Sequence, residues 1–293
     1  MGVSRTCLVI GILVLAVLAA GAWMLFGRHA KAPEPAPAEP QKVSVPVPSA
    51  KGIGSSVEGR SITAYSYGTG PKHLLFVGGM HGGYEWNSVL LAYQFMDYLA
   101  AHPETVPASL TIDVIPSINP DGVFKAVGKE GRFSAADAST DSKVLASARF
   151  NAHAVDLNRN FDCKWQATST WQGRPVSAGT SAFSEPESRA VRTVVTEHHP
   201  AAVVFWHSQA NAVYASECTQ GILPGTLASM DAYAHAAGYP AVKTFDAYPI
   251  TGDAEGWLAS IGIPAITVEL ATHETVEWDR NLLGIQALID LYK

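Results

Sequence analysis

The 293-residue chain carries little charge of either sign. Only 16% of its residues are Asp, Glu, Lys or Arg, the formal net charge is −6, and no block of basic residues occurs. Binding to a nucleic-acid backbone needs clustered Lys and Arg, so we expect no nucleic-acid partner. With 47% hydrophobic residues, the composition is that of a globular domain with a substantial core.

Cysteine is also scarce, with three residues in the whole chain. Cys7 lies in an apolar segment, and the remaining pair, Cys163 and Cys218, is spaced too widely for a structural zinc site. In an oxidising compartment this pair can form a disulfide. The sequence does not show how far apart the two thiols lie, so the paired and the free states both stay open.

A long apolar run stands near the N-terminus. Residues 7–26, CLVIGILVLAVLAAGAWMLF, contain no charged side chain and are long enough for a helix to span about 30 Å of hydrocarbon. Cleaved signal peptides have shorter apolar regions that end at small residues, and the AGA at 20–22 is a candidate for such a site. The length favours an uncleaved membrane anchor. Both interpretations export the rest of the chain to the periplasm or the cell exterior.

Composition divides the chain into three segments. Residues 1–30 contain the anchor or signal segment. Residues 31–51 follow as a semi-rigid spacer in which Pro alternates with Ala, Glu and Val. Residues 52–293 are expected to form one globular domain, without an internal repeat.

The globular part alternates between strand-like and helix-like segments. Short apolar runs typical of strands occupy 61–68, 73–79, 110–118, 201–208 and 264–270. Longer segments typical of helices occupy 85–102, 185–199 with Ser184 as the N-cap, and 282–293. The alternation predicts an α/β sheet covered by helices.

Polar residues stand where several predicted strands end: His81, Asn119 with Asp121, His207 and Glu269. Open α/β sheets bind ligands outside the carboxyl ends of their strands, so we expect these side chains to lie together in a polar rim at that edge of the sheet. Strands also lead into polar loops for no functional reason. The alternative for each of these residues is therefore a structural one, such as a core histidine whose ring hydrogen-bonds to the backbone.

The stretch GGMHGGYEWNS, residues 78–88, places His81 and Glu85 in a glycine-rich turn. Glycine is used where the backbone bends sharply or something approaches closely. A histidine and a carboxylate four residues apart can meet on one side of a turn, and both are zinc ligands. Alone, this stretch fits a metal site and an incidental polar turn equally well.

A series of motifs occurs in a fixed order over residues 54–270: SSVEGRSI, MHGGYEW, NPDG, VDLNRNFD, FSEPES, FWHS, YPITG and TVEL. Together they resemble the zinc carboxypeptidases, the family of carboxypeptidase A and the bacterial murein-peptide amidases. VDLNRNF and the order of the set are specific. The resemblance implies a mixed, twisted sheet flanked by helices on both faces, and a zinc-dependent metallocarboxypeptidase that hydrolyses an amide next to a free carboxylate in peptides.

The resemblance also implies one zinc ion, whose three ligands match His81, Glu85 and His207. A catalytic zinc keeps a fourth position for water and lowers the pKa of that water. Glu269 matches the general base that takes the water proton and returns it to the leaving amine. Arg149 resembles the arginine that stabilises the tetrahedral oxyanion, although taken alone it is typical of a surface salt bridge.

Substrate-binding residues are implied in the same way. Asn158 and Arg159 match the pair that grips the substrate's terminal carboxylate, for which Arg offers a bidentate fork. Tyr248 matches the tyrosine that closes over the substrate. Glu255 falls at the bottom of the family's side-chain pocket, where an acid favours an amine-bearing side chain. Alternatively, Glu255 or Asp253 caps the helix that starts here and faces solvent.

One departure from the family concerns the first two ligands. The family spaces them as His-x-x-Glu, whereas HGGYE contains one extra residue and Tyr84 stands where the acid is expected. The glycine pair can absorb the insertion by reshaping the turn, so Glu85 remains the expected ligand.

Three functions stay open at this point. The first is a metallocarboxypeptidase, with cell-wall stem peptides among its substrates if the source is a bacterium. The second is a deacylase of small N-acyl amino acids that resembles the aspartoacylase branch. The third is an inactive module that retains the carboxylate-binding residues, and the presence of both His81 and His207 together with Glu85 and Glu269 argues against it.

Overall fold

The computed structural model describes residues 48–246 and 248–293, which fall in the unit Val45–Lys293. The apolar run at 7–26, predicted to be a helix, lies outside the described residues. Within the described part, no helix combines the length and the hydrophobicity needed to cross a membrane.

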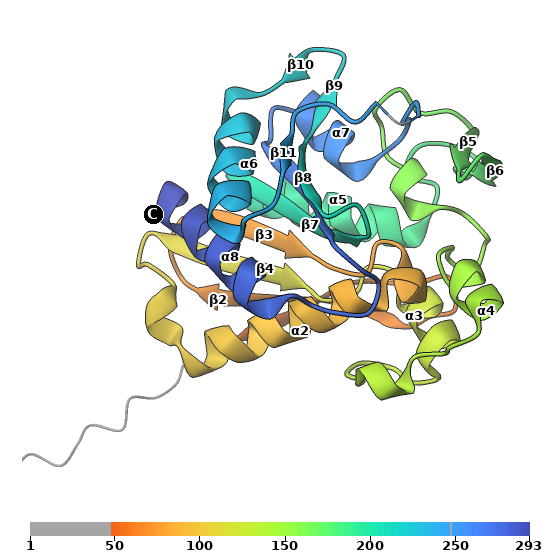
Figure 1. Ribbon diagram of the computed structural model, residues 1–293, viewed down its shortest axis with the longest axis horizontal. Coiled ribbons are helices and arrows are strands. Elements are labelled where there is room, and N and C mark those ends of the chain that lie inside the picture. Colours follow the sequence, from red (N-terminus) through yellow and green to blue (C-terminus); the bar gives the residue numbers. More distant parts are fainter. Residues whose placement is uncertain (1–47, 247) are drawn as a thin grey trace, which may run out of the picture. The chain divides into compact units, whose positions relative to one another are not determined.

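An eight-stranded mixed sheet runs through the molecule (Figure 1). Its strands, in spatial order, are β1 (Ser49–Ser55), β2 (Ser61–Gly68), β4 (Leu110–Ile115), β3 (Lys72–Val77), β7 (Ala202–Ser208), β12 (Ala265–Leu270), β8 (Ala212–Ala215) and β11 (Ala241–Val242). The central strands β4, β3, β7 and β12 are parallel, whereas the pairs β1–β2, β2–β4 and β8–β12 are antiparallel. The expected mixed sheet is confirmed.

Helices cover both faces of this sheet. The helices on one face are α2 (Trp86–Ala101), α6 (Pro224–Ala237) and α8 (Trp278–Tyr292), which lie in front of the sheet in Figure 1. Those on the other face are α5 (Pro186–His198) and α7 (Ala254–Ser260). Because the central parallel strands are buried on both faces, β3 and β7 contain the continuous apolar runs LLFV and AVVFW, whereas β4 also carries the buried Asp113.

The remaining elements are short and lie in the segments that connect the strands and helices of the sheet. They are η1 (Gly82–Glu85), η2 (Pro103–Thr105), α3 (Pro120–Val127), η3 (Ala135–Asp137), α4 (Ser142–Ser147), η4 (Leu157–Arg159), β5 (Thr168–Trp171), β6 (Arg174–Ser177), β9 (Glu217–Cys218) and β10 (Gly221–Ile222). Two of them, η1 and η4, carry residues of the site described below.

Two details of the sequence analysis change. Ser184 is not the N-cap of α5: the helix begins at Pro186, and the extended residue Glu185 takes the cap position. Proline favours the first helical position and disfavours a helical conformation in the residue before it, which moves the start of the helix. In addition, β1 begins at Ser49, so sheet pairing starts within the segment assigned to the spacer.

Cys163 and Cys218 form a disulfide, with their Cα atoms 6.1 Å apart. The bond joins the loop after η4 to β9. The carbonyl of Cys163 also accepts a hydrogen bond of 2.7 Å from the backbone N–H of Gly252, in the loop before α7. Three loops that are distant in sequence are therefore held together on one side of the site.

Candidate metal centre and pocket

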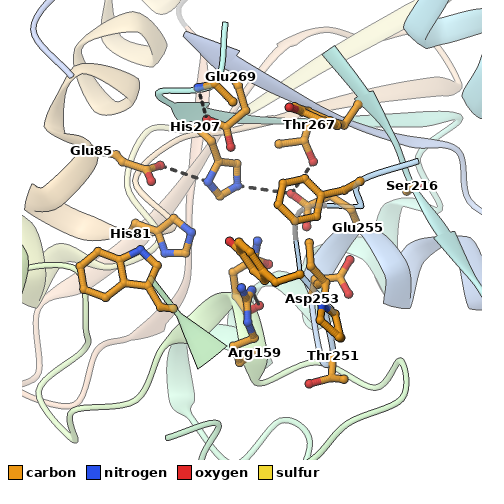
Figure 2. A pocket seen from close by; sticks show the side chains of 18 of the residues that line it. His81, Glu85, Arg159, His207, Ser216, Thr251, Asp253, Glu255, Thr267 and Glu269 are labelled. Carbon is orange, nitrogen blue, oxygen red and sulfur yellow. Dashed lines mark hydrogen bonds and ion pairs between the residues drawn. The ribbon is translucent and has the colours of Figure 1, made fainter. Parts of the chain in front are cut away.

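His81, Glu85 and His207 converge beyond the carboxyl ends of β3 and β7 (Figure 2). One ligand atom from each side chain lies within 4.8 Å of the other two, and all three residues are buried. His207 belongs to β7, whereas His81 follows β3 through a turn and Glu85 ends η1. The structure therefore brings the three expected ligands together.

The extra residue in HGGYE is taken up by η1, a single 3-10 turn. Gly82 has φ +47°, and a Cβ there would lie 2.5 Å from a backbone oxygen. A Cβ on Gly83 would lie 2.2 Å from an alanine methyl group, so glycine is required at both positions. The turn directs Oε2 of Glu85 to within 3.1 Å of Nδ1 of His207 and places Tyr84 in the wall of the pocket.

The ring nitrogens of this triad test whether the site suits a metal ion. Nδ1 of His81 and Nε2 of His207 are buried without a hydrogen-bond partner. Burial lowers the pKa of His81, and the charge of Arg149 lowers it further. Burial acts in the same direction on His207, but the carboxylates of Glu85 and Glu255 outweigh it and raise the pKa. Two imidazoles and a carboxylate are a donor set that zinc prefers, so the residues fit a zinc ion.

A fully buried carboxylate, Asp156, connects the triad to two neighbouring functional residues. Its Oδ2 accepts hydrogen bonds from Nε and Nη2 of Arg149, at 3.0 and 2.9 Å. Its Oδ1 accepts one from the backbone N–H of Asn158, at 3.2 Å, and lies 3.5 Å from Nδ1 of His81. A carboxylate beside a ligating histidine orients the ring and raises its basicity. The sequence analysis did not single out Asp156, although its place in VDLNRNF was a signal.

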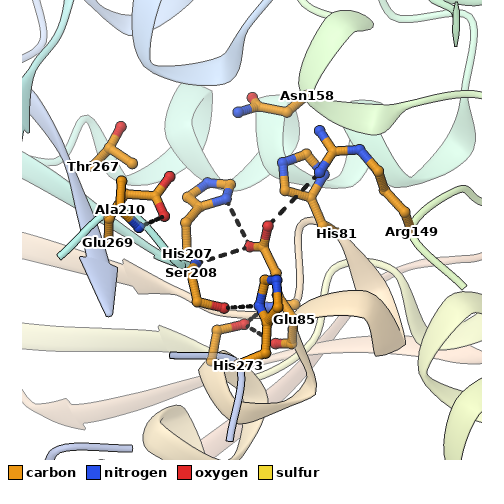
Figure 3. Close-up of polar contacts among 12 residues, drawn as sticks. His81, Glu85, Arg149, Asn158, His207, Ser208, Ala210, Thr267, Glu269 and His273 are labelled. Carbon is orange, nitrogen blue, oxygen red and sulfur yellow. Dashed lines mark hydrogen bonds and ion pairs between the residues drawn. The ribbon is translucent and has the colours of Figure 1, made fainter. Parts of the chain in front are cut away.

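Arg149 is buried, so the alternative of a surface salt bridge is wrong. Its Nη1 lies 3.7 Å from Oε1 of Glu85, and its guanidinium stands 4.7 Å from the centre of the Trp171 ring. Figure 3 shows Arg149 and His81 on the same side of Glu85. The guanidinium therefore faces both the metal ligands and the pocket.

Asn158 and Arg159 reach the same pocket from η4. Nη1 of Arg159 donates to the carbonyl of Asn158 at 2.5 Å, whereas its Nε is buried without a partner. Oδ1 of Asn158 accepts a hydrogen bond of 2.9 Å from the backbone N–H of Ala254, which fixes the amide orientation. A buried guanidinium nitrogen without a partner is suited to bind an anion.

Glu269 on β12 pairs directly with His207 on β7 in the sheet register. Its Oε2 accepts a hydrogen bond of 3.3 Å from the backbone N–H of Ala210. Burial and the neighbouring Glu85 carboxylate raise the pKa of Glu269 to about 7. A carboxylate with a pKa near neutrality, beside metal ligands, is suited to proton transfer.

The triad, Arg149, Asn158, Arg159 and Glu269 line one cavity of about 670 Å³, a size typical of ligand-binding sites. Tyr248 also lines it, in the loop before α7, and packs edge-on against Phe245 with ring centroids 4.8 Å apart. The residues expected to form the ligand, base, oxyanion and substrate groups therefore share one pocket.

Two acids at the start of α7 complete the lining: Glu255, which is buried, and Asp253, which is half-buried. Asp253 caps α7 by accepting a hydrogen bond of 2.7 Å from the backbone N–H of Gly256. Glu255 has no cap contact: its Oε1 accepts a bond of 3.1 Å from Thr267 and lies 3.3 Å from Nε2 of His207. The capping alternative therefore applies to Asp253, and Glu255 is buried in the pocket wall and does not face solvent.

Asn119 and Asp121 do not join the rim, which corrects the expectation for that strand end. Asn119 caps α3, and its amide donates to the carbonyl of Arg149 at 3.2 Å. Asp121 accepts hydrogen bonds of 2.6 Å from Ser56 and 2.8 Å from Arg60. The chain turns into α3 four residues after β4, so Asn119 supports the loop that carries Arg149, and Asp121 holds the turn between β1 and β2.

His273 and Tyr84 are further pocket residues that the sequence pattern did not reveal. Nδ1 of His273 lies 2.7 Å from Oγ of Ser208, and burial lowers the pKa of His273. Tyr84 packs against the rings of His273 and Trp171, with centroids 4.6 and 5.1 Å away. None of these three rings stands at the end of a predicted strand, so the pattern of polar residues at strand ends did not identify them.

Comparison with known proteins agrees with this arrangement. The family model described as zinc carboxypeptidase matches residues 47–277. Carboxypeptidase B of Helicoverpa zea is 27% identical over 223 residues, which cover 61% of this chain and 50% of that protein. The chain thus spans about half the length of the relatives that it matches.

Solved structures share the fold. Carboxypeptidase A from Helicoverpa armigera superposes with a TM-score of 0.65 at 21% identity, over 84% of this chain and 68% of that one. Murein-tripeptide amidase MpaA from Escherichia coli O157 superposes with a TM-score of 0.58 at 21% identity, over 84% of this chain and 92% of that one.

The triad predicts a tight zinc site that depends on His207. Replacing one of three protein ligands should weaken zinc binding by more than about 100-fold, above the 10- to 100-fold effect typical of residues that only orient a ligand. Competition with a chromophoric chelator measures this for His207→Ala in the full-length chain. His273→Ala, in the same pocket but outside the triad, serves as the control and should keep wild-type affinity. Unchanged affinity in His207→Ala would refute the ligand assignment.

Proposed function

The chain belongs to the zinc carboxypeptidase family, and we propose that it is a zinc metallopeptidase that hydrolyses the amide bond next to a free carboxylate in a peptide. One observation carries the proposal: Arg159, whose Nε has no hydrogen-bond partner among the described residues, lines the same cavity as the metal ligands. An anion site and a metal site in one cavity suit a substrate whose scissile amide lies close to its carboxylate.

In this proposal the triad, Glu269 and Arg149 each have a defined role in the reaction. Zinc bound by the triad lowers the pKa of a water and polarises the substrate carbonyl. Glu269 accepts the proton of the attacking water and passes it to the leaving amine. The Arg149 guanidinium donates to the oxygen on which negative charge develops, and its bonds to Asp156 hold it in place.

The free carboxylate of the substrate binds to Arg159 and Asn158. Arg159 offers two parallel donors, and the Asn158 amide is already oriented by its bond to Ala254. Tyr248 closes over the substrate from its loop. Such fixed contacts hold the amide near Glu269 and reduce the entropy lost when the reacting groups align.

The role of Glu269 is tested by Glu269→Gln. An amide cannot carry the proton, so kcat should fall by at least about 100-fold while zinc affinity and substrate Kd change little. Steady-state kinetics and calorimetric binding on the same preparation measure both quantities. Glu217→Gln, an exposed acid at the rim of the pocket, is the matched control and should retain kcat. Near wild-type turnover in Glu269→Gln would show that another group is the base.

The carboxylate-binding role predicts a selective effect of Arg159→Ala. Loss of a hydrogen bond to a charged group is worth about 1.5–3 kcal/mol, so KM should rise roughly 10- to 100-fold for peptides with a free C-terminal carboxylate. C-terminally amidated peptides of the same sequence should be affected little, because they lack the charged partner. Equal losses on both substrates would contradict this role.

We further propose that the substrate side chain next to the carboxylate carries an amine, as in Lys, Arg or the diaminopimelate of cell-wall stem peptides. The support is the lining of the pocket, where Glu255 is buried, Asp253 is half-buried, and Oγ of Ser216 has no partner among the described residues. A substrate amine would add a charged partner for the two acids, whereas an apolar side chain would leave Oγ of Ser216 unpaired, which costs on the order of 1–3 kcal/mol.

This specificity is measured as kcat/KM for matched peptides that end in Lys or in Phe. We expect at least a 10-fold preference for Lys in the unmutated chain, since an unpaired buried group is worth about 1.4 kcal/mol or more. Glu255→Gln keeps the size of the side chain and should reduce the preference, while Glu217→Gln should leave it intact. A preference of the unmutated chain for Phe would end the proposal.

We also propose that the catalytic domain, residues 52–293, is exported and held at a membrane by residues 7–26. The disulfide between Cys163 and Cys218 supports this, because such bonds persist in oxidising compartments. Protease added outside the cytoplasmic membrane of expressing cells should reach the domain, and a domain protected until lysis would contradict export.

A further inference from the structure

His73, Asp113 and His198 form a second cluster of metal-ligating side chains, away from the pocket. They come from the beginning of β3, the interior of β4 and the last turn of α5. The pocket lies beyond the ends of β3 and β7, whereas His73 stands near the start of β3. The cluster therefore lies toward the opposite edge of the sheet, and none of its members lines the pocket.

Both imidazoles in this cluster face the same carboxylate oxygen. Nδ1 of His73 and Nδ1 of His198 lie 2.7 and 2.9 Å from Oδ2 of Asp113. Ser66 donates to the other oxygen, Oδ1, at 2.5 Å and so fixes the carboxylate plane. The Asp113 side chain is fully buried, while those of His73 and His198 are 22% and 21% exposed. Solvent can therefore reach the two rings but not the carboxylate.

Within the part of the chain that the structure describes, Asp113 has no permanently charged positive partner. Among residues 48–246 and 248–293, no Lys or Arg lies within ion-pair distance of it, and its two contacts of this kind are with imidazoles. An imidazole supplies positive charge only when it is protonated. A buried carboxylate in this position is stabilised by a bound cation.

The C-terminal end of α5 also favours a bound cation at this cluster. His198 belongs to the last turn of this 13-residue helix, where the unpaired carbonyl groups carry the negative end of the helix dipole. A cation held by His198 therefore gains from the helix as well as from Asp113.

We propose that His73, Asp113 and His198 form a second metal site, which binds a divalent transition ion such as zinc, nickel or copper. Two imidazole nitrogens and a carboxylate suit these ions, whereas calcium and magnesium prefer oxygen ligands. Bonds of about 2.0–2.2 Å place two ligand atoms on one ion roughly 3.3 Å apart, so the rings move outward by about half an ångström. Their exposed edges leave room for this movement.

A ligating nitrogen carries no proton, so metal binding through Nδ1 places the proton of each neutral ring on Nε2, the nitrogen that does not bind the ion. The bound ion then ties the C-terminal end of α5 to β3 and β4. Because any ligand that binds the folded state alone stabilises it, the site acts on the stability of the fold and leaves the peptidase pocket unchanged.

The test is a titration of the metal-stripped, full-length chain with zinc or nickel, followed by calorimetry and elemental analysis. We expect two equivalents per chain, with the second lost in His73→Gln and in His198→Gln. Glutamine can still donate a hydrogen bond to Asp113, so these variants keep their fold, but they lose the imidazole ligand. His199→Gln, which changes the adjacent exposed histidine, should retain both equivalents, and His207→Ala should lose only the pocket ion.

The second equivalent should also raise the Tm of the unmutated chain and leave that of His198→Gln unchanged, while kcat/KM stays at the wild-type value in both His→Gln variants. Uptake of a single equivalent by the unmutated chain would overturn the proposal. A second equivalent that survives the double substitution His73→Gln/His198→Gln would overturn it as well, because the ion would then be held elsewhere.

Discussion

The buried carboxylate of Asp156 is the contact on which the pocket depends. It binds Arg149 through two hydrogen bonds, fixes the start of η4 through the backbone of Asn158, and lies beside the ring of His81. The ring of His81, the guanidinium of Arg149 and the turn that carries Asn158 are thus oriented by one charge, as the roles proposed for them require. Without this carboxylate, Arg149 would remain buried without its main partner, a situation that typically costs several kcal/mol.

The parallel centre of the sheet supplies the second constraint. Because β3, β7 and β12 end at the same edge, His81, His207 and Glu269 meet although they are far apart in sequence. The glycine turn η1 then brings Glu85 against His207, and the disulfide joins the loops on the other side of the cavity. The His73 cluster lies toward the opposite ends of these strands, near the start of β3. The pocket and the proposed second metal site are therefore on opposite sides of the sheet along the strand direction.

The sequence predicted those parts that depend on local pattern. Apolar runs located the central strands, and the polar residues at their ends identified His81, His207 and Glu269. Pattern alone does not show where a chain goes after a strand, which is why Asn119 and Asp121 were wrongly placed on the rim. Tertiary packing between distant segments decides the features that sequence pattern could not show. They are the partners of Asp156, the contact between His273 and Ser208, and the burial of Glu255. Family resemblance, rather than periodicity, supplied Arg149, Arg159 and Tyr248.

The central claim is that one zinc ion, held by His81, Glu85 and His207, shares a cavity with a carboxylate-binding arginine. Anomalous scattering at the zinc edge, from crystals of Glu269→Gln grown with one equivalent of zinc and a peptide that ends in Lys, tests it most directly. We expect an anomalous peak bonded to these three side chains, with the peptide carboxylate against Arg159. No peak at the triad, or a peptide carboxylate bound away from Arg159, would contradict it.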